Sequence, residues 1–517
     1  MASRLYLALL SLPLAALPAC DATPTEAAPP PSVVLVVLDT LRPDHLGCYG
    51  YERDTSPHLD QLAEESIVFE NAQSAAPWTA PSLASLLTSL YPDVHGVKDF
   101  PRPRRIHRNA ATLAENLSAR GYTTAAFTEG GYAKATFGLG RGFDIFPAHA
   151  GDSVGYTSNM NAPSRLEANL GLADKWLAKR GERPFFLLFH TYEVHSPLCP
   201  PVKDLEFFRP THNDEKYRAR VCQTIEAWNN KRELDRQGAR LLRLDAFYHA
   251  YEDCPPIADR EGLIERSDEF GEYLAKEWAV QSPEVVQWVN DLYDAELRYM
   301  DAQLSRLWES LKSKGLWENT VVVLVSDHGE SLGDNNAMGH GSNLHESLLR
   351  ALLMVRLPGP TAPRGKRVDS VVRLIDVMPT LLELTGTDLP ENPLQGTSLM
   401  PLINGAADER IAFGHSAHPK NAEAGQSPYS IRRGPWHLIE AVDGSTARLY
   451  HVPSDPQEET DLARSEPAMA RELLGILAAQ KRQDLTLRKQ LGAVGKETEI
   501  DSGTLEELRH LGYMGDE

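Results

Sequence analysis

Basic residues and long hydrophobic runs are both scarce in this chain, and each shortage excludes a class of protein. The 517 residues hold 52 Lys and Arg against 72 Asp and Glu, so the formal net charge is -20. Such a chain repels phosphate backbones and anionic lipid, and we therefore expect no nucleic-acid partner. Beyond the first 20 residues, no run reaches the ~18 apolar residues of a membrane-spanning helix. An anionic substrate would need local positive charge, from a metal ion or a helix end.

The first 20 residues have the pattern of a targeting signal. Arg4 is the only early charge, and residues 5–17 are almost wholly apolar. The sequence Leu17-Pro18-Ala19-Cys20 resembles a bacterial lipoprotein cleavage box, which would make Cys20 the acylated residue. Ordinary signal cleavage after a small residue is the alternative. We expect an exported protein, periplasmic, on the outer membrane or at the cell surface, that touches a membrane only through a lipid on Cys20.

Four further cysteines remain, so the exported chain could form two disulfides. Pairing of Cys222 with Cys254, within one polar segment, is the arrangement we favour. The other interpretation is that Cys48, Cys199, Cys222 and Cys254 are free buried thiols.

Apolar runs alternate with helical stretches along the first 400 residues. Runs at 33–38, 185–189 and 321–325 are typical of strands that are buried on both faces of a parallel sheet. The alternation predicts an α/β fold with a large doubly wound sheet flanked by helices, followed by a small C-terminal α+β subdomain. The expected segments are a signal (1–20), a Pro-, Ala- and Thr-rich linker (21–31), a catalytic domain (32–400) with a mostly helical insertion at about 200–290, and the subdomain (401–517). In that subdomain, strands are expected at 432–440 and 447–452, and a closing helix at 501–514.

Acidic and imidazole side chains follow three of the predicted strands. The first run ends in Asp39, the second in His190, and the third in Asp327-His328. Ligands bind beyond the carboxyl ends of the strands in open α/β sheets, so these side chains should meet at one edge. Each alone could be a turn or a helix cap. Their joint occurrence predicts a functional site.

Thr79 lies where a helix should begin, because Pro81 suits a first helical turn. Its hydroxyl could cap that helix, or it could be a nucleophile stabilised by the helix dipole and a metal ion. Asp39, Thr79, Asp327 and His328 would together supply a tetrahedral-like set of ligands for one divalent ion. Mixed oxygen and nitrogen ligands favour Zn or Mn, with Ca or Mg as alternatives.

Three histidines are candidates for acid–base catalysis or anion binding, although an isolated histidine is more often structural. They are His190, His195 and His340. His195 belongs to an extended, exposed-looking segment that favours function. His340 lies between two glycines, where the backbone can approach a ligand closely.

At these residues the chain resembles the sulfatase family of the alkaline phosphatase superfamily, over roughly residues 32–465. The resemblance implies a metal-dependent ester hydrolase with an alkaline phosphatase-like fold and an anionic ester substrate. It implies that Thr79 is the nucleophile and a metal ligand, and that His195 and His340 hold the anion or the leaving group, with His190 also catalytic. The matching segments are 37–47, 79–88, 91–97, 193–197, 326–330, 338–346 and 449–462.

The chain departs from the family at four points. Sulfatases have a Cys or Ser, oxidised to formylglycine, where this chain has Thr79, and the family Arg is replaced by Leu83. The second acid of the opening pair is Thr40, and the Lys usual near His340 is missing. Threonine at the nucleophile position is usual in phosphodiesterase and phospho-group-transferring relatives. The resemblance therefore indicates a sulfatase, whereas threonine at the nucleophile position indicates that the substrate is a phosphoester.

Three functions follow from these observations. The first is hydrolysis of sulfate or phosphate esters through a metal-bound Thr79. The second is transfer of a phospho group to a cell-surface glycan or lipid. The third is non-catalytic binding by a protein that retains the fold, which the four metal-competent groups disfavour.

Overall fold

The computed structural model describes residues 29–100, 102–147, 164–195, 198, 200–208, 283–341, 343–417, 429–441, 446–492, 500 and 502–510. The predicted signal with Cys20, most of the linker, three of the cysteines (Cys199, Cys222 and Cys254) and most of the insertion lie outside these residues. Cys48 is a free, partly buried thiol. Within the described ranges, no helix has both the length and the apolar character needed to cross a bilayer.

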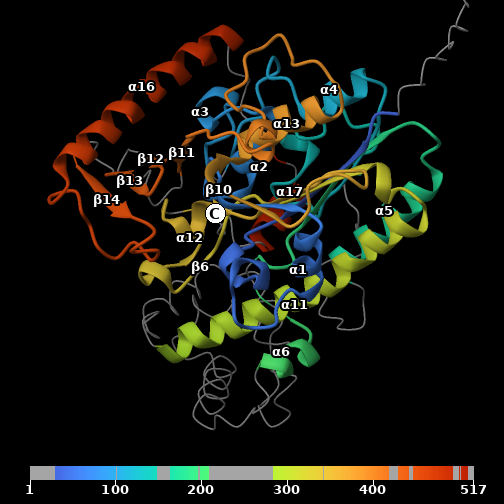
Figure 1. The fold of residues 1–517 in the computed structure, drawn as a ribbon, viewed down its shortest axis with the longest axis horizontal. Helices are drawn as coiled ribbons and strands as arrows, with labels where there is room; N and C mark the ends of the chain where they lie inside the picture. Colours follow the sequence, from blue (N-terminus) through green and yellow to red (C-terminus); the bar gives the residue numbers. More distant parts are fainter. Residues whose placement is uncertain are drawn as a thin grey trace, which may run out of the picture.

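A large mixed β-sheet forms the centre of the molecule (Figure 1). The apolar runs predicted from sequence become its central strands, and β1 pairs in parallel with β4 on one side and β5 on the other. The strand β9 is antiparallel to both of its neighbours, which makes the sheet mixed. In spatial order the strands are β10 (Lys366–Arg373), β2 (Ile67–Gln73), β9 (Leu353–Arg356), β5 (Thr320–Ser326), β1 (Ser32–Leu38), β4 (Phe185–Thr191) and β3 (Thr123–Phe127), with β8 (Arg350–Ala351) beside β2.

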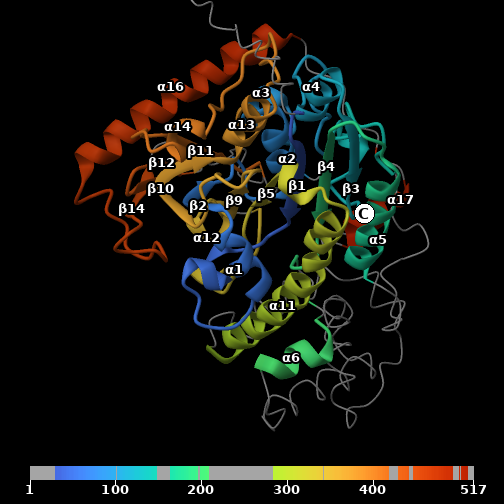
Figure 2. The same ribbon diagram turned by 45° about the vertical axis from the view of Figure 1, so that its right-hand side comes forward.

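Alternating side chains of β1 enter two separate hydrophobic cores. Val33, Leu35 and Val37 pack into one core, whereas Val34 and Val36 pack into the other. Because both faces are covered, the strand is a continuous apolar run. One face is covered by α2 (Thr79–Thr88), α4 (Leu113–Ala119) and α13 (Val377–Leu384), and the other by α1 (Pro57–Glu64), α5 (Arg165–Lys179) and α11 (Pro283–Ser313) (Figure 2).

The C-terminal subdomain is a small antiparallel sheet covered by one long helix, α16 (Pro467–Leu491). Ile431, Leu438 and Leu449 from the sheet and Leu473 from the helix form its core. This agrees with the predicted α+β subdomain. Its strands are β11 (Ile411–His415), β12 (Tyr429–Arg433), β13 (Trp436–Glu440) and β14 (Ala447–His451).

The strand predicted at 432–440 is wrong in its bounds, because the chain turns there. Gly434 adopts a φ of 51°, which glycine tolerates, and Pro435 has no N–H to donate to a ladder. Two strands, β12 and β13, therefore form a hairpin. The closing helix predicted at 501–514 is present as α17 (Ser502–His510), and residues 501 and 511–514 lie outside the described part of the chain.

Candidate metal and ester-binding site

Strand pairing brings three predicted metal ligands together. Leu38 of β1 lies beside Ser326 of β5, so Asp39 and Asp327 leave the sheet side by side. One ligand atom each of Asp39, Asp327 and His328 lies within 4.8 Å of the others, and all three residues are buried. The expected convergence at the carboxyl edge of the sheet is confirmed for these residues.

Each of the three residues presents one polar atom that has no hydrogen-bond partner within the described part of the chain. These atoms are Asp39 Oδ1, Asp327 Oδ2 and His328 Nε2. His328 Nδ1 lies 2.9 Å from the Gly329 carbonyl oxygen, which can only accept a hydrogen bond, so Nδ1 carries the proton and Nε2 presents its lone pair. Buried polar atoms without partners are costly. A divalent cation would satisfy all three, so the donor set fits a metal ion.

The pKa values of the three ligand residues also indicate that the cluster binds a cation. Burial raises the pKa of Asp39 to about 7 and that of Asp327 well above its ordinary value, and the neighbouring Asp39 carboxylate adds to the rise at Asp327. Burial also holds the pKa of His328 well below its ordinary value, so its imidazole is neutral. Two carboxylates and a neutral imidazole would balance the charge of one divalent ion.

Thr79 stands beside these ligands at the first residue of α2. The residue before it, Trp78, is the N-cap, and no side chain caps the helix. The capping interpretation of the Thr79 hydroxyl is therefore wrong. Instead, the fully buried side chain of Thr79 hydrogen-bonds to the Asp39 carboxyl group. Ser82 anchors the same helix, because its hydroxyl donates to the Asp327 carbonyl oxygen at 2.6 Å.

His340 and His195 lie together beside the ligand cluster. Their ring centroids are 4.7 Å apart, and the His340 centroid is 4.8 Å from that of His328. Burial lowers the pKa of His340, but the Glu330 carboxylate, 3.1 Å from Nδ1, raises it, and Asp39 and Asp327 add to this rise. The net effect is a pKa above the ordinary value, which favours an imidazolium beside the site.

His195 is buried, so its predicted exposure is wrong. Only 2% of its surface is exposed, and its backbone N–H donates to the Tyr192 carbonyl oxygen at 2.8 Å. A tight turn after β4 folds residues 193–195 back over the sheet edge, where the Tyr192 ring lies edge-on to the His195 ring. Tertiary packing, which the local sequence does not reveal, produces this burial.

His190 lies behind Asp39. Its Nε2 is 3.2 Å from Asp39 Oδ2, the oxygen that does not belong to the unpartnered set. Burial lowers the pKa of His190. The residue is the sixth of β4 and pairs with Val37, so it lies within the strand. At this position His190 can orient the carboxylate of Asp39, a metal-ligand residue.

Two residues to which the sequence assigned no role support the site. Glu330 is the hydrogen-bond partner of His340. Thr40 has a φ of 57°, unusual for a β-branched residue. This conformation directs its backbone N–H to Asp327 Oδ1 at 3.4 Å, while its hydroxyl is 3.0 Å from the Val194 carbonyl oxygen. The Thr40 hydroxyl is therefore engaged with backbone carbonyl oxygens, of which that of Asp39 is nearer at 2.7 Å. The strained backbone is a feature that the sequence could not reveal.

A second cluster of potential ligands is an ion-pair network. Glu346, His437 and Glu458 are buried together. Arg432 Nε lies 3.1 Å from Glu346 Oε1, and His345 Nδ1 lies 2.8 Å from Glu458 Oε2. With these side chains as partners, the carboxylates need no metal, and the network joins the C-terminal subdomain to the rest of the molecule.

Comparison with known families agrees with this arrangement. The family model described as Sulfatase matches residues 31–387, and the model described as N-sulphoglucosamine sulphohydrolase, C-terminal, matches residues 342–482. Iduronate 2-sulfatase of Mus musculus is 24% identical over 413 residues, which cover 69% of each chain. An arylsulfatase of Clostridium perfringens is 24% identical, covering 84% of this chain and 91% of its own.

Two solved structures share the fold. One is a protein in complex with its substrate D-glucosamine-2-N,6-O-disulfate, with a TM-score of 0.65 and 21% identity over 88% of this chain and 98% of that one. The other is the phosphonate monoester hydrolase of Agrobacterium radiobacter, with a TM-score of 0.62 and 20% identity over 89% and 96%. Because the family model covers more than half of the sequence, this chain belongs to the sulfatase family and is an ester hydrolase of that family.

Proposed function

We propose that this protein hydrolyses an anionic ester with Thr79 as the nucleophile, and that phosphate esters are better substrates than sulfate esters. The observation that carries the proposal is the convergence of three unpartnered, buried ligand atoms beside the Thr79 hydroxyl. A site that only bound an anion would have no need of a buried hydroxyl next to a cation site.

The roles of the residues follow from their contacts. The Thr79 hydroxyl passes its proton to the carboxylate of Asp39, its hydrogen-bond partner, as its oxygen bonds to phosphorus or sulfur. The bond to the leaving oxygen breaks in the same step. The leaving oxygen takes a proton from the histidine pair His340 and His195, of which His340 is kept protonated by Glu330. Water then releases the group from Thr79.

A divalent ion completes this proposal. Asp39, Asp327 and His328, with the Thr79 oxygen, would hold it. When bound, such an ion would polarise the ester oxygens and lower the pKa of the hydroxyl. We favour Mn or Zn because imidazole is one of the ligands, and because the Thr40 side chain adds no further oxygen, whereas Ca prefers oxygen alone.

The identity of residue 79 supports the preference for phosphate. Oxidation of a threonine gives a ketone, not the aldehyde of formylglycine. Residue 79 of this chain therefore cannot be converted to formylglycine. Leu83, in place of the family Arg, is buried in the main core, so it supplies no charge for that chemistry. The phosphonate monoester hydrolase with the same fold shows that the fold also serves phosphorus esters. The names of several relatives, such as iduronate 2-sulfatase and N-acetylglucosamine-6-O-sulfatase, contain sugars, and we favour a sugar ester.

We also propose that the protein works outside the cytoplasm, attached through Cys20. The targeting pattern of residues 1–20 supports this. Mass spectrometry of the mature N-terminus tests it, because a diacylglyceryl group on Cys20 is expected and an unmodified N-terminus would contradict it.

The reaction is tested with matched aryl sulfate, aryl phosphate and bis-aryl phosphate substrates, in the presence of Mn, Zn or Ca ions. Thr79→Ala should abolish turnover, and Thr79→Ser should retain part of it. The matched control is Thr88→Ala, because Thr88 is a buried threonine on the same helix whose hydroxyl donates to Ala84. Mass spectrometry should find residue 79 unmodified. Sulfate turnover that exceeds phosphate turnover, or activity that survives Thr79→Ala, would overturn the proposal.

A further inference from the structure

We propose that a polar cavity between the catalytic domain and the C-terminal subdomain binds a neutral or amine-bearing sugar unit of the substrate. The inference rests on the proposed function, because it assigns a place to the alcohol part of the ester. It concerns residues that take no part in the metal site.

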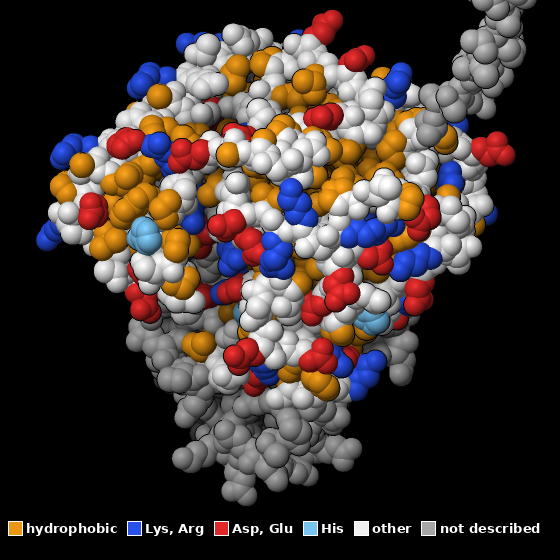
Figure 3. All heavy atoms as spheres, in the orientation of Figure 1, with side chains coloured by type: hydrophobic (Ala, Val, Ile, Leu, Met, Phe, Trp, Pro, Cys, Tyr) orange, Lys and Arg blue, Asp and Glu red, His pale blue; other side chains and the backbone are white. Residues whose placement is uncertain are grey.

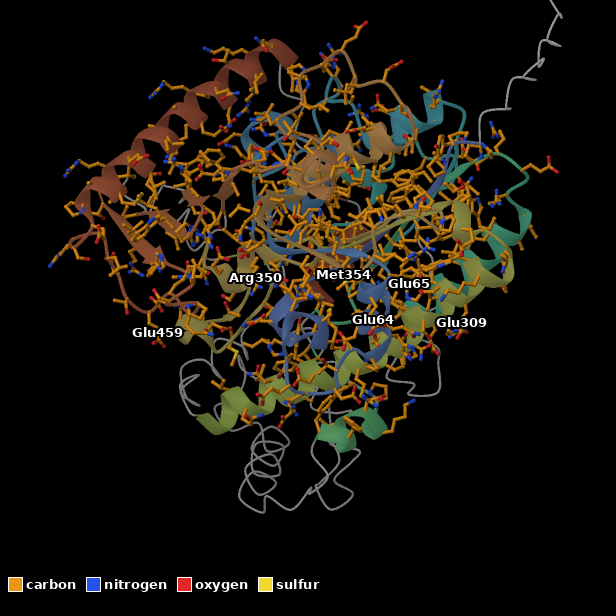
Figure 4. The ribbon with its side chains drawn as sticks, viewed as in Figure 1. Glu64, Glu65, Glu309, Arg350, Met354 and Glu459 are labelled. Atoms are coloured by element: carbon orange, nitrogen blue, oxygen red, sulfur yellow. The ribbon has the colours of Figure 1, made fainter. Side chains whose placement is uncertain are left out.

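The cavity has a volume of about 920 Å³, which lies within the range of small-molecule sites. One wall is the segment after β1 and the first turns of α11, and another is the loop between β6 (Ser331–Leu332) and β7 (Met338–Gly339). The subdomain closes it with β14 and the following loop, including Tyr450 and Glu459. Glu459 lies at the lower edge of the subdomain (Figure 4).

Two histidines line this cavity and are held in the same way. His45 Nδ1 lies 2.7 Å from Asp294 Oδ1, and His345 Nδ1 lies 2.8 Å from Glu458 Oε2. His45 and His345 are only 4% and 8% exposed, and among the described residues the side-chain hydrogen bonds of both rings are made at Nδ1. A carboxylate at Nδ1 fixes the ring and directs Nε2 away from itself. The two Nε2 atoms are therefore preorganised hydrogen-bonding groups of the cavity.

The charge of the lining determines which ligand fits. Five carboxylates line the cavity against two guanidinium groups, Arg42 and Arg448. Arg42 pairs with Asp44 and Asp334, and Glu458 pairs with His345, so Glu459 and Asp461 remain beside Arg448; the lining as a whole still holds more carboxylates than guanidinium groups. An anionic ligand would be repelled, and an apolar one would leave the polar lining unsatisfied. Hydroxyl groups, or an ammonium group, fit these acceptors, and the rings of Tyr51 and Tyr450 are suited to lie against a sugar.

A chain of hydrogen bonds through Glu330 runs from the cavity lining to His340. Arg42 Nη1 donates to the Glu330 carbonyl oxygen at 3.1 Å, and the carboxylate of the same Glu330 holds His340. The hairpin of β6 and β7 leads directly from the cavity wall to His340. A substrate that spans both places would have its ester at Thr79 and a further sugar in the cavity. On the face of the molecule in Figure 3, acidic and basic side chains are intermingled.

Substitutions that remove only Nε2 test the proposal. The amide of asparagine can replace Nδ1 of histidine but does not reach the position of Nε2. His45→Asn and His345→Asn should therefore keep the contacts to Asp294 and Glu458, and thermal unfolding checks that they do. Glu459→Gln removes one exposed carboxylate and serves as a variant that cannot disturb folding through the core. Binding of glucosamine, N-acetylglucosamine and glucuronic acid to the full chain is measured by calorimetry or ligand-observed NMR.

We expect glucosamine and N-acetylglucosamine to bind, and glucuronic acid to bind at least tenfold more weakly. Each Asn variant should weaken sugar binding about threefold to tenfold. Glu459→Gln should reduce the preference for glucosamine over N-acetylglucosamine. Hydrolysis of aryl esters should be unchanged in all three variants, whereas KM for a glucosamine-containing disaccharide ester should rise without a change in kcat.

The two proposals fail in different ways. Absence of sugar binding, tighter binding of glucuronic acid, or equal sugar affinity in the wild type and both Asn variants would overturn the cavity assignment, whatever the activity. Absence of turnover of every ester by the wild type, with variant-sensitive sugar binding intact, would overturn the proposed function and leave the cavity assignment standing.

Discussion

Replacement of Asp39 by Asn should stabilise the metal-free protein at neutral pH and remove its stabilisation by metal. Asp39 is fully buried, and burial raises its pKa from an ordinary 3.8 to about 7. The folded state therefore binds this proton more tightly than the unfolded chain. Stability from this group is present below about pH 4 and is lost as the pH rises to about 7.

The magnitude follows from the two pKa values. At about 1.36 kcal/mol per pKa unit, a rise from 3.8 to about 7 corresponds to roughly 4 kcal/mol, which is lost in full above about pH 7. Asparagine does not titrate, so the variant should lack this loss. A divalent ion reverses the sign, because it favours the charged carboxylate. An ion at 100 times its Kd should add about 2.7 kcal/mol to the wild type and little to the variant.

Urea unfolding at about pH 5 and pH 8, with a chelator and with Mn ions, measures these differences. Asp376→Asn is the matched control, because Asp376 is equally buried but is paired with Arg373 and Arg410. That substitution should destabilise the protein by ~3–5 kcal/mol at both pH values. The reasoning is refuted if the metal-free wild type is as stable at pH 8 as at pH 5, or if Asp39→Asn leaves stabilisation by Mn unchanged.

Three further substitutions test other parts of the account. Gly329→Ala would place a Cβ 2.0 Å from the Ser347 carbonyl oxygen and displace His328. Metal affinity measured by calorimetry should therefore fall by at least tenfold. An unchanged affinity would contradict the close approach of Gly329 to Ser347. Glu458→Gln breaks a buried pair and should lower the free energy of unfolding by ~3–5 kcal/mol. Burial raises the pKa of Glu458, but its histidine partners lower it by more, so the stability of the wild type falls as the pH drops through this depressed pKa. The variant lacks this carboxylate, so its stability should depend less on acid pH. His340→Ala should reduce kcat by ~10²- to 10⁴-fold while the metal content stays constant, and a loss of metal would instead assign His340 to the ligand set.

The parts of the fold that sequence predicted are those in which burial on both faces leaves a continuous apolar run. β1, β4 and β5 are central, and their ends determine where Asp39 and Asp327 lie. β10 was missed because it is an edge strand with half-exposed polar residues, so its apolar pattern is interrupted. The turn at Gly434 and Pro435 is visible in the sequence, but the predicted strand ran through it.

The residues at the strand ends, Thr79 at the start of α2, and the two histidines implied by the family resemblance could be predicted, whereas the surroundings of these residues could not. The burial of His195 depends on a tertiary turn against Tyr192 and has no local signal. The role of Glu330 depends on a hairpin that brings it back to His340, and that of Thr40 depends on a backbone conformation that its residue type disfavours. Contacts between residues far apart in the chain, such as those of Glu458 with His345, are likewise invisible in a single sequence.

Equilibrium dialysis against Mn ions, followed by elemental analysis, tests the central claim most directly. We predict one ion per chain in the wild type, the same in Thr88→Ala, and none in Asp327→Asn or His328→Ala at the same ion concentration. A wild type that binds no ion, or variants that bind one as well as the wild type does, would contradict the claim that these residues hold the metal.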